Sequence, residues 1–205
     1  KGPEELLNKT SITQPAILFT SYIYYKHILK ITNLKPKLMC GHSLGEYSAL
    51  VNSNSISFED ALNIVHQRGL IMEKSIKGSM YAILNTDIDI IDEVCKKVSK
   101  DENMIVNPAN INSPKQIVIA GENKAVEIVI NNLKERGYKK CIKLNVSVAS
   151  HCKLMDEPSY DFKKLLDTIK ISQPETRIIH NISASEAQDI DDLKENLIQH
   201  LTKPV

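Results

Sequence analysis

The order of the elements expected between residues 79 and 146 limits the fold of this chain more than any other feature. Hydrophobic periodicity and turn residues divide this stretch into short helices and strands. They are a strand at 79–84, a helix at 87–100, strands at 103–111 and 116–120, a helix at 123–136 and a strand at 138–146. Gly137 ends the second helix. The resulting order, β-α-β-β-α-β, is that of a ferredoxin-like unit.

The segments on both sides of this stretch follow a different pattern. They contain an expected helix at 13–30, a strand at 36–40, a helix at 46–51 and a helix that begins at Ser57. Thr13 is expected to cap the first of these helices, with Pro15 in its first turn. Asp60 completes a capping box with Ser57. These segments indicate an α/β core that is distinct from the β-α-β-β-α-β unit.

The sequence therefore predicts an α/β fold with two parts. Residues 1–77 and 147–205 are expected to form an α/β-hydrolase-like core. Residues 78–146 are expected to form an inserted ferredoxin-like (βαββαβ) small subdomain. The chain contains no internal repeat, low-complexity stretch or Gly/Ser linker that would indicate a different division.

Charge and composition exclude several classes of function. The 205 residues carry 26 basic and 25 acidic side chains, which argues against a nucleic-acid binder with a dense basic surface. The most apolar early stretch, 15–25, is shorter than the roughly 20 residues of a membrane span. No CxxC pair occurs among Cys40, Cys95, Cys141 and Cys152, so we expect reduced thiols. We expect a monomer in the cytoplasm, or in an organelle stroma if the source is a plastid-bearing eukaryote, with no nucleic-acid or membrane partner.

A candidate nucleophile lies between the predicted strand 36–40 and the helix that follows it. The sequence Gly41-His42-Ser43-Leu44-Gly45 is a GxSxG motif in a strand–turn–helix context, which exposes the serine on a tight turn. The glycines are expected because the backbone turns sharply and neighbouring elements approach closely. N–H groups and the positive end of the following helix dipole would stabilise a developing oxyanion.

A serine hydroxyl needs a base, and the chain has six histidines: His27, His42, His66, His151, His180 and His200. His27 and His66 lie on predicted helices, where a surface or packed histidine is the simpler interpretation. His151 follows a strand-like segment, and a loop after a strand is a suitable place for a base. His151 is therefore the candidate base, while His180 is compatible with either interpretation.

Arg68 shares a helical face with the apolar residues Ala61, Ile64 and Val65. A guanidinium on such a face is costly unless an anion compensates its charge. One interpretation is that the side chain extends to solvent. The other is that it binds the carboxylate of a substrate, whose geometry matches the planar guanidinium.

Four segments of the chain resemble the malonyl-CoA:acyl carrier protein transacylases. They are the serine segment 41–51 (GHSLGEYSALV), the arginine segment 67–69 (QRG), the loop and strand 110–121 (NINSPKQIVIAG) and the histidine segment 146–155 (VSVASHCKLM). The similarity runs in order from about Thr13 to Val205. Several separate motifs therefore agree, which is more specific than the serine motif alone.

The resemblance implies a two-step acyl transfer in fatty acid biosynthesis, without a metal or a bound organic cofactor. Ser43 would attack the thioester of malonyl-CoA while His151 takes its proton, and the thiol of acyl carrier protein would then accept the malonyl group. The backbone N–H of Leu44 would stabilise the oxyanion. Arg68 would bind the malonyl carboxylate, and His42 would contribute to substrate binding. Backbone carbonyls orient the histidine in this family, so Ser43 and His151 would form a dyad.

The sequence differs from the family pattern in three respects. It lacks the family's N-terminal Gly-Gln-Gly segment and its C-terminal glutamine-bearing loop, so we expect the central part of a longer enzyme that is poorly active alone. Ala149 also stands where proline is frequent. Because methylmalonyl-selective relatives carry Tyr-Ala-Ser-His there, methylmalonyl remains an alternative to malonyl.

Other functions are less consistent with these residues. A serine esterase or thioesterase would use Ser43 and His151, but it requires an acid between them and leaves Arg68 unexplained. A non-catalytic scaffold leaves all three residues unexplained. An acidic carrier protein would need a basic surface. The candidates are Lys134, Arg136, Lys139, Lys140 and Lys143.

Overall fold

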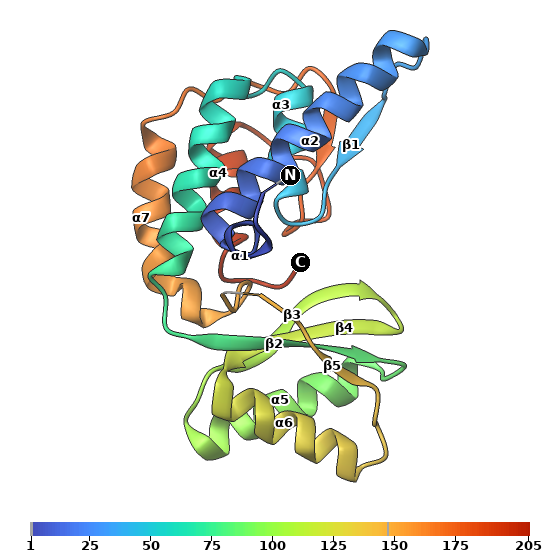
Figure 1. Ribbon diagram of the computed structural model, residues 1–205, viewed down its shortest axis with the longest axis vertical. Coiled ribbons are helices and arrows are strands. Elements are labelled where there is room, and N and C mark those ends of the chain that lie inside the picture. Colours follow the sequence, from blue (N-terminus) through green and yellow to red (C-terminus); the bar gives the residue numbers. More distant parts are fainter. Residues whose placement is uncertain (1, 147) are drawn as a thin grey trace. The chain divides into compact units, whose positions relative to one another are not determined.

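The computed structural model describes residues 2–146 and 148–205. Within them the chain divides into two compact units, which are described separately (Figure 1). Unit 1 comprises the residues up to Glu73 together with Tyr160–His200, and unit 2 comprises Lys74–Ser159 with Leu201–Val205. Ser147, part of the predicted histidine segment, lies outside the described residues. The predicted limits of the small subdomain, residues 78 and 146, stay a prediction.

Unit 1 is built mainly from helices around a short parallel strand pair. The helices are α1 (Glu4–Leu7), α2 (Thr10–Ile31), α3 (Gly45–Asn52), α4 (Phe58–Glu73), the part of α7 (Asp156–Asp167) from Tyr160, and α8 (Ile190–Gln199). Strands β1 (Leu38–Cys40) and β6 (Arg177–Ile179) pair in parallel, with Cys40 opposite Ile179. Strand β1 therefore ends directly before the GxSxG motif, as the sequence predicts.

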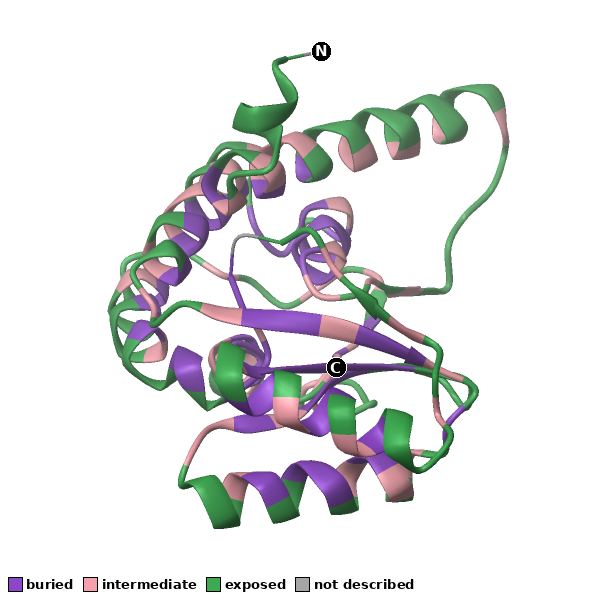
Figure 2. Cartoon of the chain, turned by 60° about the horizontal axis from the view of Figure 1, so that its bottom comes forward, coloured by how far each residue is buried: buried purple, intermediate pink, exposed green. Residues whose placement is uncertain are grey.

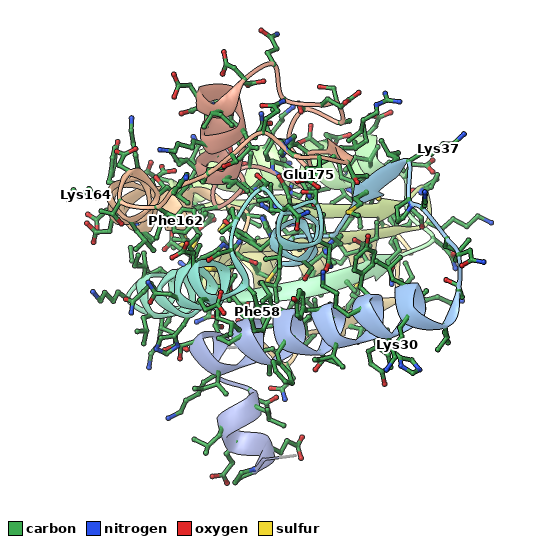
Figure 3. The ribbon with its side chains drawn as sticks, turned by 90° about the horizontal axis from the view of Figure 1, so that it is seen from above. Lys30, Lys37, Phe58, Phe162, Lys164 and Glu175 are labelled. Carbon is green, nitrogen blue, oxygen red and sulfur yellow. The ribbon has the colours of Figure 1, made fainter. Side chains whose placement is uncertain are left out.

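Helix α4 begins as the sequence predicts. The Ser57 hydroxyl accepts a hydrogen bond from the Asp60 N–H at 3.0 Å, which satisfies one of the free donors of the first turn. Phe58, labelled in Figure 3, stacks on Tyr22 of α2 with ring centroids 4.3 Å apart. The helix is thereby anchored to α2 at its first residue.

The start of α2 differs from the expectation. The helix begins at Thr10, so the prediction that Thr13 caps it is wrong, and Pro15 lies inside the helix. Pro15 has no N–H to bond the Ser11 carbonyl four residues earlier. His66 Nδ1 lies 2.8 Å from that carbonyl oxygen. Because a carbonyl only accepts, Nδ1 carries the proton, and the imidazole on α4 replaces the missing donor.

The two longest helices of unit 1 approach very closely at Gly69. A Cβ atom at this position would lie 2.4 Å from Ser11 Cα, which no packed side chain tolerates. At the same place the Ser11 N–H donates to Glu73 Oε1 at 2.8 Å. Gly69 therefore sets the distance between α2 and α4.

Unit 2 has the predicted β-α-β-β-α-β order. Its elements are β2 (Gly78–Leu84), α5 (Ile88–Glu102), β3 (Val106–Ser113), β4 (Gln116–Glu122), α6 (Asn123–Glu135), β5 (Cys141–Lys143) and the short 3₁₀ helix η1 (Lys153–Met155). The four strands form an antiparallel sheet in the order β3-β4-β2-β5. This arrangement confirms the ferredoxin-like expectation. Strand β5 is shorter than the predicted 138–146, because only Cys141–Lys143 pair with β2.

Each face of this sheet has its own apolar core. Helices α5 and α6 lie on the same side of the sheet, and their buried residues fall on one side of each helix (Figures 1 and 2). On the other face, Met80 and Val118 pack with Ala149 and Leu154. Among the described residues, no helix has both the length and the apolar character needed to cross a membrane.

The close approach at Gly69 yields a test of the fold. Replacing a glycine inside a helix with alanine normally adds about 1 kcal/mol of stability. For Gly69→Ala we expect a loss of about 1–3 kcal/mol, because the new methyl group meets the backbone of α2. Equilibrium denaturant unfolding measures the difference.

Gly45→Ala is the matched control, since a Cβ at position 45 meets nothing within 4 Å in the part of the chain that the structure describes. The free energy of unfolding of the Gly45→Ala protein should not fall. A Gly69→Ala protein as stable as the parent would contradict the helix packing described for unit 1.

Candidate active site

The GxSxG motif forms the turn between β1 and α3. A Cβ on Gly41 would lie 2.1 Å from the carbonyl carbon of Gly45, so only glycine fits at position 41. At Gly45 a Cβ would meet none of the described residues within 4 Å. The expectation that close packing requires both glycines is therefore right for Gly41 and wrong for Gly45.

Ser43 sits at the tip of this turn, partly buried, with φ at 48°. Leu44 occupies the N-cap position of α3, and its N–H has no acceptor within the described residues. An unbonded N–H at a helix N-terminus is suited to stabilise negative charge. The His42 side chain is exposed, and its carbonyl accepts from the Gly45 N–H at 2.9 Å. These positions are compatible with the predicted roles of Ser43, Leu44 and His42, which stay predictions.

Arg68 lies on α4 and is buried, with only 2% of its surface exposed. The alternative in which its side chain extends to solvent is therefore wrong. Nη1 donates to Gln14 Oε1 of α2 at 2.8 Å. The guanidinium carbon lies 5.5 Å from the ring centroid of Tyr47, one turn after Ser43 on α3. Within the described part of the chain, Nε and Nη2 have no hydrogen-bond partner.

This environment is unfavourable for a cation. Removing a charged group from water costs several kcal/mol, and one neutral hydrogen bond does not offset that cost. Burial also raises the pKa of the Tyr47 phenol far above its ordinary value, although the positive charge of Arg68 opposes this rise. Tyr47 is therefore neutral at pH 7 and supplies no countercharge. A ligand carboxylate would satisfy both the charge and the two unbonded nitrogens of Arg68.

Gln14 was not expected from the sequence, and among the described residues it makes the one side-chain hydrogen bond to Arg68. In the structure, Ser11, Gln14 and Leu18 share one face of α2 and are the buried residues of that helix. The Gln14 Nε2 donates to the Met72 sulfur at 3.4 Å, which fixes the amide with its oxygen toward Arg68.

His151 belongs to unit 2, in the segment between β5 and η1. Its side chain is buried, and its backbone is left-handed with φ at 61°. The His151 N–H donates to the Leu201 carbonyl at 2.9 Å, and its carbonyl accepts from Asn107 Nδ2 at 3.2 Å. The backbone at the candidate base is thus fixed on both sides.

Cys152 follows this histidine and would itself be a conceivable nucleophile. Burial raises the pKa of its thiol to about 11, so the reactive thiolate is scarce at neutral pH. The thiol donates to the Ala149 carbonyl at 3.4 Å. Cys152 is therefore a packing residue. Among the described residues, no cluster of three or more His, Cys, Asp or Glu side chains is arranged to hold a metal.

The predicted site residues are divided between the two units. Ser43, Leu44, His42 and Arg68 belong to unit 1, whereas His151 belongs to unit 2. Within unit 1 the serine turn and the arginine are connected through Tyr47. The pairing of Ser43 with His151 stays a prediction.

The chain is similar to malonyl CoA-acyl carrier protein transacylases in sequence and structure. It is 39% identical to the protein of that name from Haemophilus influenzae over 209 aligned residues, which cover 100% of the chain and 66% of the relative. The crystal structure of the Xanthomonas oryzae pv. oryzae transacylase matches with a TM-score of 0.96 at 35% identity, over 100% of this chain and 65% of that one.

A third match is the malonyl-transacylase PlMCAT, solved in complex with its type II PKS acyl-carrier protein. It has a TM-score of 0.96 and 39% identity, and the match covers 100% of this chain and 67% of that chain. The chain thus spans about two thirds of the length of these relatives. The sequence model of the family described as the acyl transferase domain matches residues 1–203 of the 205. The chain therefore belongs to the acyl transferase domain family.

Proposed function

We propose that this chain is the malonyl-transferring part of an enzyme of fatty acid biosynthesis. It would move a malonyl group from malonyl-CoA to the phosphopantetheine thiol of acyl carrier protein. One observation carries the proposal. Arg68 is buried, two of its guanidinium nitrogens have no hydrogen-bond partner among the described residues, and it lies against Tyr47 on the helix that begins at the serine turn. A substrate with a free carboxylate beside its reactive carbonyl fits this arrangement.

In the first half-reaction Ser43 Oγ attacks the thioester carbonyl of malonyl-CoA, and His151 takes the hydroxyl proton. The tetrahedral oxyanion accepts a hydrogen bond from the Leu44 N–H, a type of contact whose removal costs about 10²–10³-fold in rate. The carbon–sulfur bond then breaks, and the CoA thiolate receives the proton from the imidazolium. The products are a malonyl-serine ester and free CoA.

In the second half-reaction the carrier-protein thiol attacks the serine ester. His151 accepts the thiol proton and returns it to Ser43 as the ester bond breaks. Arg68 holds the malonyl carboxylate throughout, and exposed His42 contributes to substrate binding. The chemistry needs no metal or organic cofactor, and we place it in the cytoplasm with the protein acting as a monomer.

The basic residues of unit 2 are the proposed docking surface for the carrier protein. Lys134, Lys139, Lys140 and Lys143 are exposed at the end of α6, in the segment that follows it and on β5. Arg136 is paired with Glu93 at 3.0 Å, which reduces its contribution to the positive charge of this surface. Positive charge at this edge would accelerate the encounter with an acidic partner.

The serine ester is the direct test of the proposed function. We expect intact-mass spectrometry to show one added malonyl group after the protein is mixed with malonyl-CoA, and none for Ser43→Ala. The adduct should persist until a carrier-protein thiol is added. Rapid loss of the adduct to water would instead indicate an esterase or thioesterase.

Arg68→Met removes the charge while keeping a side chain of similar size. We expect malonyl loading to fall by roughly 10²- to 10³-fold in kcat/KM, because the substrate carboxylate loses its buried partner. Loading of acetyl, which has no carboxylate, should change much less. Parallel rate measurements with malonyl-CoA and acetyl-CoA give the selectivity.

Arg177→Met is the control, since Arg177 is an exposed arginine of the same unit paired with Glu186 at 2.6 Å. It should leave both loading rates unchanged. An equal decrease for malonyl and acetyl in folded Arg68→Met protein would rule out carboxylate recognition by Arg68.

Charge reversal tests the docking surface. The double variant Lys139→Glu/Lys140→Glu should raise the KM for carrier protein by roughly 10-fold and leave malonyl loading from CoA unchanged. Lys163→Glu/Lys164→Glu reverses two adjacent exposed lysines on α7 and serves as the control (Lys164 is labelled in Figure 3). If both half-reactions slowed together, or neither did, this surface would not be the docking site.

A further inference from the structure

The backbone of Ser43 is strained. Its φ of 48° lies in the left-handed region, which costs a residue with a side chain on the order of 1–3 kcal/mol. Such a conformation persists only where neighbouring groups hold it. The contacts that hold this turn are therefore part of how the serine is presented.

The carboxamide of Asn181 bonds the turn on both sides of His42. Asn181 Oδ1 accepts from the Ser43 N–H at 3.0 Å, and Nδ2 donates to the Gly41 carbonyl at 2.8 Å. One planar side chain thus fixes the separation and the orientation of two peptide groups.

The register of the strand pair explains why residue 181 reaches this place. Cys40 of β1 is opposite Ile179 of β6, and Asn181 follows Ile179 by two residues. Beyond Cys40 the chain leaves the extended conformation, so a backbone ladder cannot continue. The Asn181 side chain provides the donor and the acceptor that a neighbouring strand would otherwise provide.

Glu46 determines which way the Asn181 amide faces. Glu46 is fully buried, and its Oε2 accepts from the Asn181 backbone N–H at 3.2 Å and also from Asn181 Nδ2. An ionised carboxylate only accepts hydrogen bonds, so the amide nitrogen must face Glu46. The amide oxygen is then left to accept from the Ser43 N–H.

The Glu46 carboxylate has further partners within unit 1. His180 Nδ1 lies 2.6 Å from Glu46 Oε1, and His200 Nδ1 lies 3.6 Å from Oε2. Both histidines are buried. Glu46 also lies in the first turn of α3, where the helix dipole favours an anion. Both carboxylate oxygens are therefore held in place as hydrogen-bond acceptors.

We propose that Asn181 is a positioning residue for the Ser43 nucleophile, with its amide oriented by the buried Glu46–His180 pair. The role of Ser43 as nucleophile rests on the proposed function above. Asn181 touches no reacting atom in this scheme. It acts by holding the peptide groups of Gly41 and Ser43 so that the serine hydroxyl is presented in one orientation.

Asn181→Asp is the sharpest substitution, because it keeps the shape and replaces the donor with an acceptor. The new carboxylate oxygen would face both Glu46 and the Gly41 carbonyl, which repel it. The probe is phenylmethylsulfonyl fluoride, which forms a sulfonyl ester with the serine oxygen and releases fluoride. Intact-mass time courses give both the rate constant and the final labelled fraction.

We expect the rate constant of Ser43 sulfonylation to fall by roughly 10- to 100-fold, since small displacements of a reacting group have effects of this size. The final labelled fraction should stay complete, because misfolding lowers that fraction whereas mispositioning lowers the rate. The malonyl-CoA concentration for half-maximal loading should not change, as Arg68 and Gln14 are untouched. If Asn181→Asp does not fold, Asn181→Ala removes both bonds without adding charge and is judged by the same rate constant.

Asn54→Asp is the matched control. Asn54 also has a left-handed backbone, with φ at 59°, and its Nδ2 donates to Glu175 Oε2 at 2.7 Å (Glu175 is labelled in Figure 3). This exposed pair lies in the same unit, so the same chemical change should leave the sulfonylation rate unaltered. A parental rate for the Asn181 variant, or an equal decrease in the Asn54 variant, would overturn the proposal.

The two proposals can fail separately. If the parent protein is sulfonylated at Ser43 but is not loaded from malonyl-CoA, the malonyl transfer is wrong and the sulfonylation rates still decide the role of Asn181. If malonyl loading occurs and the Asn181 variants load and sulfonylate at the parental rate, only the role of Asn181 is wrong.

Discussion

The burial of the Arg68 guanidinium depends on how closely α2 and α4 pack. Gly69 lets the first turns of α2 approach the backbone of α4, and the neighbouring Arg68 is covered as a result. The same approach brings Gln14 within hydrogen-bonding distance of Nη1. A larger residue at position 69 would separate the helices, admit water and remove the low-dielectric surroundings that strengthen a charge–charge interaction. The helix contact is thus the physical basis of the proposed carboxylate recognition.

Unit 1 contains two buried charged side chains of opposite sign, and their surroundings differ in a way that separates their roles. Glu46 has His180 on one oxygen and Asn181 on the other, so its cost of burial is largely offset inside the fold. Arg68 has one neutral acceptor among the described residues, and two of its nitrogens are unbonded. A buried charge whose hydrogen bonds are made within the fold fixes the positions of its neighbours. A buried charge that lacks such partners gains them when a ligand of opposite charge binds. This difference is the reason for assigning Glu46 to the support of the turn and Arg68 to the substrate.

The sequence predicted the parts of this structure that depend on local patterns. The β-α-β-β-α-β order followed from hydrophobic periodicity, and the start of α4 followed from Ser57 and Asp60. The start of α2 was misplaced because Pro15 suggested a first turn. Pro15 is tolerated inside the helix because His66, 51 positions further along the sequence, provides the hydrogen-bond donor that the proline lacks. Gln14 and Asn181 were missed for the same reason, since their partners Arg68 and Ser43 are remote in sequence and become neighbours only in the folded unit.

Ser43 and His151, the two residues proposed for proton transfer and acylation, both have left-handed backbones. Neither is a glycine, so each conformation must be held by contacts whose energy exceeds the strain. At Ser43 the turn is held by the Asn181 carboxamide, and at His151 by Leu201 and Asn107. In both cases the holding groups bond the peptide units and leave the reactive side chain to other partners. A motif such as GxSxG records where the chain turns, but the orientation of the serine also depends on a side chain that the motif does not contain.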